Sequence, residues 1–254
     1  MNSDGPLGII LAAGRGSRMG IATRDKPKGM VEMKGRPLIA WQVEALRAAG
    51  CSEVIAIGGY CWEQLMPLVE VRYINESWAD TNMVSTLCCA STELSQRHCL
   101  VSYSDILYHP HAPRALLSAT GDITITYDRL WGELWRLRFD NPLEDAETFR
   151  IDHNDLIEIG AKANSMEEIE GQFMGLISIT PNGWQKIKAI CKSLPVAKLR
   201  RLDVTMLLSK LLAAGVSIGA VPVDGQWIEV DNLTDIEKYE KQLSIKETWA
   251  HDWR

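Results

Sequence analysis

The sequence lacks the features typical of secreted, membrane-spanning and metal-cluster proteins. Its six cysteines form no C-x-x-C pair and show no metal-site spacing, so we interpret them as reduced, small apolar side chains. No run approaches the roughly 18 apolar residues of a membrane span. The first residues have neither the basic start nor the long apolar core of a signal peptide. These absences predict a cytoplasmic protein with no membrane partner.

An excess of positive charge is also missing. The chain has 27 Lys and Arg against 33 Asp and Glu, which gives a formal net charge of −6. Because a protein that covers nucleic acid needs a basic surface, this balance argues against nucleic acid as the main partner. The cationic residues are therefore expected to act locally, at a site.

The rest of the composition is that of a globular protein. With 254 residues, 46% of them hydrophobic and 24% charged, the chain can bury a substantial core. We expect one domain over residues 1–254, with a nucleotide-binding half at about 1–120 and a substrate-side half at about 121–254. Whether copies of the chain associate as a homo-oligomer is left open by the sequence.

Short apolar runs alternate with amphipathic stretches of helical length in the first half, which is typical of a parallel sheet covered by helices. Gly50 is placed to end a helix over 37–50, and Gly58 and Gly59 to end the second strand. The runs expected as strands are 7–12, 53–59, 71–75 and 98–107, and those expected as helices are 37–50 and 83–94.

The pattern changes after residue 120. Residues 122–127, 133–139, 148–160 and 171–180 are strand-like, with "HND" at 153–155 as the turn of a hairpin. This predicts an antiparallel extension beside the parallel sheet. Helices are expected near 181–192 and 203–214, then strands over 216–223 and 226–231. A last helix is expected to begin at Thr234, with Glu237 completing a capping box.

The stretch "GIILAAGRGSRMG" at 8–20 places an apolar strand directly before a glycine-rich turn. Backbone N–H groups that point outward from such a turn bind phosphate oxygens, and Gly14 and Gly16 let the chain approach the anion. Arg18, and Lys28 from "DKPKGM", can add charge-assisted contacts. The spacing is neither the Rossmann fingerprint nor a P-loop. Read in isolation, a glycine turn after a strand is usually only a turn.

The string "LAAGRGSRMG", followed by "KPK", closely resembles the signature of nucleotidyltransferases that join a nucleoside triphosphate to a sugar phosphate or to phosphocholine. Further segments resemble the phosphocholine cytidylyltransferase branch: "TNMVSTLCCA", "SYSDILY", "PLEDAETFR", "EIEGQFMGL" and "WIEVDNLTDIEKYE". The resemblance covers roughly residues 7 to 240. It implies a Rossmann-like mixed α/β fold, which agrees with the pattern of runs.

The resemblance also implies site residues for the nucleotide and for Mg²⁺. Asp105 follows the apolar run "CLVSY", at the sheet edge where ligands bind, and by resemblance it is the Mg²⁺ ligand. Asp231 ends "QWIEVD" in the same way, and two such carboxylates can hold Mg²⁺. Glu229 shares a face with Asp231 by strand alternation.

Arg18 and Lys28 are the expected catalytic cations. The residues assigned to nucleotide binding are Leu11, Ala12, Ala13, Gly14, Arg15, Gly16, Ser17, Asn82 and Ser85. Asn82 and Ser85 fall in the segment that the resemblance places near the nucleobase and ribose. Asn82 is also a good helix N-cap, and the two interpretations are compatible.

For the acceptor we assign Lys162, Trp135, Asp203, Trp227 and Glu229. Lys162 falls where the sugar branch has Glu-Lys-Pro, here with Ala161 and Ala163 as its neighbours; an exposed surface lysine is the alternative. Nine tryptophans accompany only three phenylalanines, and tryptophan offers the best face for an organic cation. We expect Trp135 and Trp227 on strands of the substrate-side half, with core packing as the alternative.

These residues predict a Mg²⁺-dependent cytidylyltransferase. A phosphorylated or phosphonylated small amine or alcohol, such as phosphocholine or 2-aminoethylphosphonate, would attack the α-phosphorus of CTP and release pyrophosphate. The alternatives are a sugar-1-phosphate nucleotidylyltransferase, a glycosyltransferase of similar fold and a non-catalytic nucleotide-binding module. A glycosyltransferase usually has Asp-x-Asp, whereas "SYSDIL" holds one Asp. A module without activity has no need of both Asp105 and Asp231.

Overall fold

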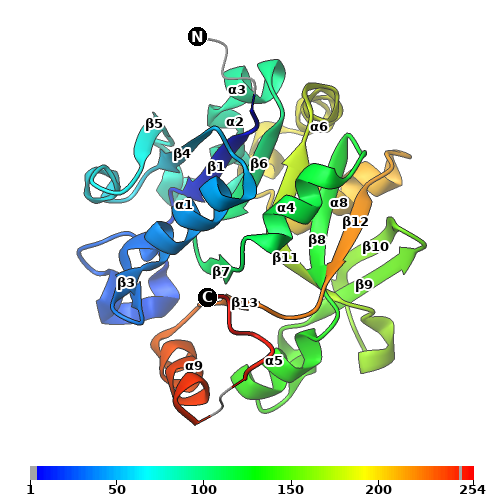
Figure 1. Cartoon of the computed structure of the whole chain (residues 1–254). Helices are drawn as coiled ribbons and strands as arrows, with labels where there is room; N and C mark the ends of the chain where they lie inside the picture. The colour runs from blue at the N-terminus through cyan, green and yellow to red at the C-terminus, as the bar shows by residue number, and fades with distance from the viewer. Residues whose placement is uncertain (1–4, 246–247) are drawn as a thin grey trace.

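A mixed sheet runs through both halves of the chain in the computed structural model (Figure 1), which describes residues 5–245 and 248–254. Residues 1–4 and 246–247 of the expected domain lie outside this description. The strand order is β5-β4-β1-β6-β11-β8-β12-β10-β9. The bounds are β1 Leu7–Ala12, β4 Glu53–Gly58, β5 Glu70–Ile74, β6 Cys99–Tyr103, β8 Ile123–Asp128, β9 Glu147–Asp152, β10 Asp155–Lys162, β11 Gln172–Ile179 and β12 Gly219–Val223. The predicted mixed α/β class is confirmed.

The parallel part of the sheet is centred on β1, which pairs with β4 on one side and β6 on the other. All six residues of β1 are buried, as expected for a strand covered on both faces. The chain runs from β1 outward to β4 and β5, and then returns to the other side of β1 with β6. The order therefore reverses between β1 and β6, and open α/β sheets bind ligands beyond the carboxyl ends of the strands at such a point.

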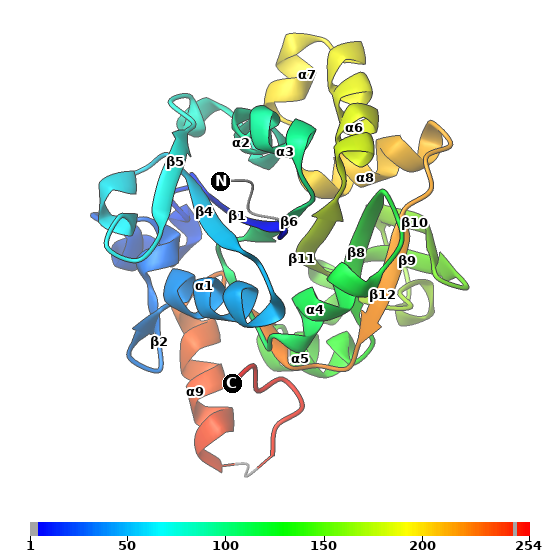
Figure 2. The same ribbon diagram turned by 45° about the horizontal axis from the view of Figure 1, so that its top comes forward.

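Helices cover both faces of this sheet (Figures 1 and 2). Helix α1 (Leu38–Ala49) contacts α4 (His111–Ser118) on one face. Helices α2 (Met83–Cys89), α3 (Ser91–Gln96), α6 (Pro181–Ser193), α7 (Val196–Arg200) and α8 (Val204–Ala213) form a connected group on the other. As predicted, α1 ends at Gly50, whose φ of 113° favours glycine. In the part of the chain that the structure describes, no helix is both long and apolar enough to cross a membrane.

The predicted antiparallel extension is also confirmed. Strand β11 is antiparallel to both β6 and β8, and β9 and β10 form a hairpin at the end of the sheet. Asp152 pairs with Asp155 across the hairpin, so His153 and Asn154 make the two-residue turn. His153 has φ 55°, in the left-handed region required by such turns.

The expected strand at 133–139 is wrong, because residues 133–138 belong to helix α5 (Trp131–Arg138) and Phe139 is its C-cap. Trp131, Leu134, Trp135 and Arg138 are buried. Their spacing of three, four and seven residues is that of one helix face. Alternating apolar and charged letters over this short stretch imitate a strand. Trp135 is therefore a helical residue.

The last helix, α9 (Leu233–Ile245), begins one residue before the expected Thr234. The predicted capping box of Thr234 and Glu237 is also wrong. Asp235 N donates to Asn232 Oδ1 at 3.0 Å, and Asn232 N donates to Asp235 Oδ2 at 3.2 Å. The reciprocal pair thus lies two residues earlier, where the chain leaves Asp231.

The remaining elements are short. Strand β7 (Ile106–Tyr108) pairs antiparallel with β13 (Trp227–Glu229), and β2 (Glu32–Met33) pairs with β3 (Arg36–Pro37). The 3-10 helices are η1 Ser17–Thr23, η2 Lys28–Met30, η3 Trp62–Leu65, η4 Trp78–Asp80, η5 Pro142–Glu144 and η6 Met166–Glu168. The β7–β13 ribbon matters most, because it joins the end of β6 to the chain before α9.

Candidate active site

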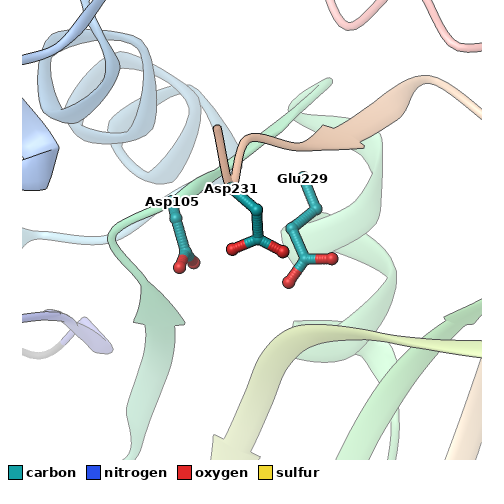
Figure 3. Close-up of side chains that lie close together, drawn as sticks. All are labelled: Asp105, Glu229 and Asp231. Carbon is teal, nitrogen blue, oxygen red and sulfur yellow. The ribbon is translucent and has the colours of Figure 1, made fainter. Parts of the chain in front are cut away.

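Asp105, Glu229 and Asp231 come together at the end of β6. Asp105 lies two residues after the end of β6, and β13 lies antiparallel to β7 with Glu229 opposite Ile106. Val230 N donates to Asp105 O at 2.8 Å, which fixes the two chain segments side by side. One oxygen from each of the three carboxyl groups lies within 4.8 Å of the others, and Figure 3 shows all three groups pointing to the same side.

Lys28 joins two of these carboxylates. Its side chain is buried, and Nζ donates to Asp105 Oδ2 at 2.8 Å and to Asp231 Oδ1 at 2.9 Å. Burial alone would lower the pKa of Lys28, but the charges of Asp105 and Asp231 outweigh burial and raise it. Burial would likewise raise the pKa of Asp231, but Lys28, Arg18 and Arg138 lower it. Lys28 is therefore protonated and Asp231 ionised at neutral pH.

The glycine-rich loop after β1 lies directly beside Lys28. Gly16 has φ 73°, and a Cβ there would lie 2.8 Å from Lys28 Cβ, so only glycine leaves room for the lysine stem. A Cβ on Gly14 would meet nothing within 4 Å. In the described part of the chain, the N–H groups of Gly14, Arg15 and Gly16 donate no turn or loop hydrogen bond to a backbone carbonyl. The loop thus combines open space with free donors, as an anion site requires.

The other residues assigned to this loop differ in what they expose. Arg18 is 68% exposed, and Nη2 lies 2.8 Å from Asp231 Oδ1. Arg15 and Ser17 are exposed, and the Arg15 guanidinium lies 5.6 Å from the centre of the Tyr60 ring. The side chains of Leu11, Ala12 and Ala13 are buried, so these three can contact a ligand only through the backbone.

Arg138, which sequence analysis missed, lies on the far side of the carboxylates, and its side chain is 1% exposed. Nη1 lies 2.6 Å from Glu229 Oε2, and Nη2 lies 2.8 Å from Asp231 Oδ2 and 3.5 Å from Asp235 Oδ2. The helical spacing of the apolar residues around Arg138 is the signal that could have found it, because it places an arginine on the buried face of α5.

Burial raises the pKa of Glu229 to about 7, and the charges of Asp231 and Asp105 add to this while Arg138 opposes it. Among the described residues, Asp105 Oδ1 is buried without a hydrogen-bond partner. An unpartnered buried carboxylate oxygen beside two further carboxylates fits a hard divalent cation, since Mg²⁺ prefers oxygen ligands.

Asn82 is the N-cap of α2, as its alternative interpretation predicted. Its side-chain oxygen accepts from Met83 N at 2.8 Å, and its own N donates to Arg200 O at 2.8 Å. Ser85 lies one turn further along α2, and α2 contacts β1, β4 and β5. Both residues thus lie beside the parallel strands β1, β4 and β5, and their contact with a nucleotide stays a prediction.

The residues assigned to the acceptor do not form one group. Trp135 and Trp227 are each 1% exposed, with ring centres 6.2 Å apart, so in this conformation they pack in the core and cannot contact a substrate. Asp203 is the N-cap of α8 and accepts from Met206 N at 2.7 Å. Lys162 is exposed at the end of β10, opposite Glu147 in register.

Tyr103 and Glu147 are further candidates that sequence analysis missed. The Tyr103 hydroxyl is buried and has no hydrogen-bond partner in the described part of the chain. Burial raises the pKa of Tyr103, and nearby carboxylates raise it further: Asp105, Asp203, Glu229 and Glu147. Burial followed by the charge of Asp203 also raises the pKa of Glu147. Carboxyl groups therefore surround Tyr103, from Asp105 and Glu229 to Glu147 and Asp203.

An open α/β sheet with a glycine-rich loop, a buried lysine and converging carboxylates at its switch point defines an enzyme of the nucleotidyltransferase class. The chain belongs to the MobA-like NTP transferase domain family, which matches residues 8–137. Its sequence is also 36% identical over 245 residues to CTP:phosphoglutamine cytidylyltransferase of Campylobacter jejuni, a match that covers 90% of this chain and 97% of that protein.

Other similarities are shorter or concern the fold. Choline-phosphate cytidylyltransferase of Streptococcus pneumoniae is 38% identical over 94 residues, which are 35% of this chain and 41% of that protein. The inositol-1-phosphate CTP transferase from T. maritima superposes with a TM-score of 0.74 at 19% identity, over 96% of this chain and 97% of the other. CTP:phosphocholine cytidylyltransferase from Streptococcus pneumoniae superposes with a TM-score of 0.70 at 22% identity, over 94% of this chain and 99% of the other. These structures share the nucleotidyltransferase fold.

Proposed function

We propose that the protein is a Mg²⁺-dependent cytidylyltransferase. A phosphate or phosphonate oxygen of a small acceptor attacks the α-phosphorus of CTP in line, the bond to the bridging oxygen breaks, and pyrophosphate leaves. The observation that carries this proposal is the junction of Lys28 with Asp105 and Asp231, directly beside the open glycine loop. Such transfer depends on positioning and charge neutralisation, and this site supplies both.

Each group of the site has a role in this reaction. The N–H groups of the glycine loop bind triphosphate oxygens, and Arg18 and Lys28 neutralise charge that develops on the departing pyrophosphate. Asp105 and Asp231 would hold Mg²⁺, which supplies a positive charge to the phosphate oxygens when bound. Asn82 and Ser85 would contact the nucleobase and ribose from the start of α2.

The acceptor is proposed to be a small phosphorylated or phosphonylated molecule with a nitrogen-containing group. The relatives named above act on phosphoglutamine and choline phosphate, and a third, 2-aminoethylphosphonate cytidylyltransferase of Lancefieldella rimae, is 30% identical over 111 residues. The acidic region around Tyr103, with Glu147 and Asp203, supports a partner that donates hydrogen bonds or carries positive charge. Lys162 would contact the acceptor's phosphate.

The test is a matrix of nucleotides and acceptors read by pyrophosphate release. CTP, UTP, ATP and GTP are each combined with phosphoglutamine, phosphocholine, 2-aminoethylphosphonate and glucose 1-phosphate, with and without Mg²⁺. We expect turnover with CTP and one of the first three acceptors, only when Mg²⁺ is present. Preference for UTP with glucose 1-phosphate would instead favour the sugar-1-phosphate nucleotidylyltransferase alternative. No turnover with any pair would favour a binding module.

Asp105→Asn is the matched test of the carboxylate site. It removes the charge that holds the cation while keeping the size of the side chain, so we expect turnover to fall by about a thousandfold or more. Asp155→Asn is the control, because Asp155 is exposed at the start of β10, beside the first residue of β12 and away from the carboxyl ends of the parallel strands. Equal activity of both variants would remove Asp105 from the site.

A further inference from the structure

Arg138 is the most deeply buried cation of the site, and nothing in the proposed reaction requires it to touch a substrate. Its guanidinium lies against two adjacent aromatic rings, with centres 4.9 Å away in Trp135 and 5.0 Å away in Phe139. Trp135 in turn packs against Trp227, on the same strand as Glu229. The guanidinium therefore has one orientation, and its two terminal nitrogens face the carboxylates.

The two oxygens of Asp231 are divided between different partners. Oδ1 accepts from Lys28 Nζ at 2.9 Å and lies 2.8 Å from Arg18 Nη2 in an ion pair, on the side of the glycine loop. Oδ2 accepts from Arg138 Nη2 at 2.8 Å, on the side of α5. Because Arg138 engages Oδ2, only Oδ1 is directed toward Asp105 and the loop.

Arg138 also engages Glu229 at 2.6 Å through Oε2. Glu229 is within ligand distance of the other two carboxylates, so without Arg138 it could join them around a cation. The number of charges at the site makes the electrostatic contribution of Arg138 large. Four carboxylates meet here, including Asp235, and two of their three cationic partners, Lys28 and Arg18, also face the glycine loop. Of these three cations, Arg138 lies away from the loop, so a bound triphosphate would compete for Lys28 and Arg18 but not for Arg138.

We propose that Arg138 is a positioning residue that limits the cation site to Asp105 and one oxygen of Asp231, and keeps Glu229 out of it. This inference rests on the proposed function. A site restricted in this way binds the free cation weakly and leaves its remaining coordination positions to the triphosphate. The tryptophans assigned to the acceptor thereby gain a different role, as the packing that fixes Arg138.

The test measures Mn²⁺ binding to the full chain without nucleotide. Binding is followed as the loss of the electron paramagnetic resonance signal of free Mn²⁺. Arg138→Met removes a positive charge and frees Glu229, so we expect tighter Mn²⁺ binding by about tenfold, together with a fall in kcat of about a hundredfold for CTP transfer. If Arg138→Met only damaged the structure, both the Mn²⁺ affinity and kcat would fall. Arg138→Lys keeps the charge but loses the two-pronged contact, so its Mn²⁺ affinity should stay near that of the wild type while kcat falls.

Two further variants make the test decisive. Arg138→Met combined with Glu229→Gln removes the freed carboxylate and should return Mn²⁺ affinity to the wild-type value. Arg136→Met, on the exposed face of the same helix, should change neither quantity. If the wild type binds Mn²⁺, but Arg138→Met and the double variant bind it equally weakly, only the proposed role of Arg138 is overturned. A wild type that binds no Mn²⁺, with or without CTP, overturns the cation site and this inference with it.

Discussion

Gly14 and Gly16 are two residues apart but lack side chains for different reasons. Gly16 has a positive φ and would place a Cβ against the stem of Lys28, so the fold requires glycine there. The position of a Cβ on Gly14 is open space, so the folded chain places no demand on this residue. A bound triphosphate is the proposed reason for keeping Gly14 small.

This difference gives the first prediction, which compares Gly14→Val with Gly16→Val. Gly14→Val should keep the wild-type melting temperature but lose CTP binding by at least about tenfold, because the side chain fills the space of the phosphates. Gly16→Val should lower the free energy of unfolding by about 1 to 3 kcal/mol. It should also weaken CTP binding. Calorimetric titration and thermal unfolding measure the two effects. Normal CTP affinity in Gly14→Val would contradict the phosphate site.

The sequence indicated the carboxylates that follow strands, but it missed the buried residues that lie next to these carboxylates. Asp105 and Asp231 follow apolar runs, so their place at the sheet edge follows from the pattern of runs. Arg138 was hidden because a charged residue on the buried face of a short helix looks like part of an alternating strand. Tyr103 was missed because only the folded structure shows its hydroxyl without a partner.

At the scale of elements, the start of α9 determines how the chain leaves Asp231. Asp235 accepts from Asp231 N at 2.9 Å and from Asn232 N at 3.2 Å, while Asn232 caps the N–H of Asp235. Helix capping and placement of a site carboxylate are thus performed by the same residues. The sequence suggested the helix and a reciprocal cap, but two overlapping S/T/N-x-x-D/E patterns made its position ambiguous.

Alanine substitutions distinguish the two positions. Asn232→Ala should lower the free energy of unfolding by about 1 kcal/mol, since a cap is lost. Thr234→Ala, at the exposed residue of the discarded capping box, should change the free energy by less than about 0.5 kcal/mol. Urea unfolding of both variants measures the difference. Equal effects would mean that the cap lies elsewhere in solution.

The edge of the parallel sheet depends on an ion-pair network. Glu53 at the start of β4 accepts from Arg72 of β5, and it also accepts from Arg97, before β6, at 3.1 Å. Hydrogen bonds from Arg72 lower the pKa of Glu53; burial opposes the shift, and the charges of Arg72 and Arg97 add to it. One carboxylate, which is partly exposed to solvent, thus links β4 to its neighbour β5 and to the segment before β6, on the other side of β1.

This network predicts a pH-dependent cost for Glu53→Gln. Because the folded pKa is below the unfolded one, the stabilisation is fully present above the unfolded pKa, about 4.3, and is lost as pH falls through the folded pKa. At pH 7 we expect a loss of about 1 kcal/mol, modest because solvent screens the pair. Urea unfolding at pH 7 and at progressively lower pH should show the difference from wild type shrinking. A difference that is constant with pH would exclude the ion pairs as its cause.

For the whole molecule, alternating runs and glycine positions predicted the mixed sheet and its antiparallel extension. They did not predict how distant segments meet. The β7–β13 ribbon is only three residues per strand, yet it places Asp231 beside Asp105, more than a hundred residues away in the sequence. Such pairing depends on tertiary contacts that no local window contains.

The end of the chain shows the same long-range dependence. Ala250 O accepts from Gln226 N at 2.6 Å, just before β13, and Trp249 packs on Tyr239 of α9 with ring centres 5.7 Å apart. Trp253 is 2% exposed and meets Trp41 of α1 edge-on, with ring centres 6.0 Å apart. Residues 248–254 thus connect the first half of the chain to the segment that carries Glu229 and Asp231.

Trp253→Ala tests this connection. Removing a buried tryptophan leaves a cavity between α1 and the C-terminal segment, so we expect the free energy of unfolding to fall by about 3 kcal/mol or more. The KM for CTP should rise as well, because β13 loses a support that keeps Asp231 beside Asp105. Val196→Ala, whose side chain is 74% exposed, is the control and should change neither quantity. Denaturant unfolding and steady-state kinetics measure the two effects. A Trp253→Ala protein with wild-type stability would show that the C-terminal segment does not hold the two halves together.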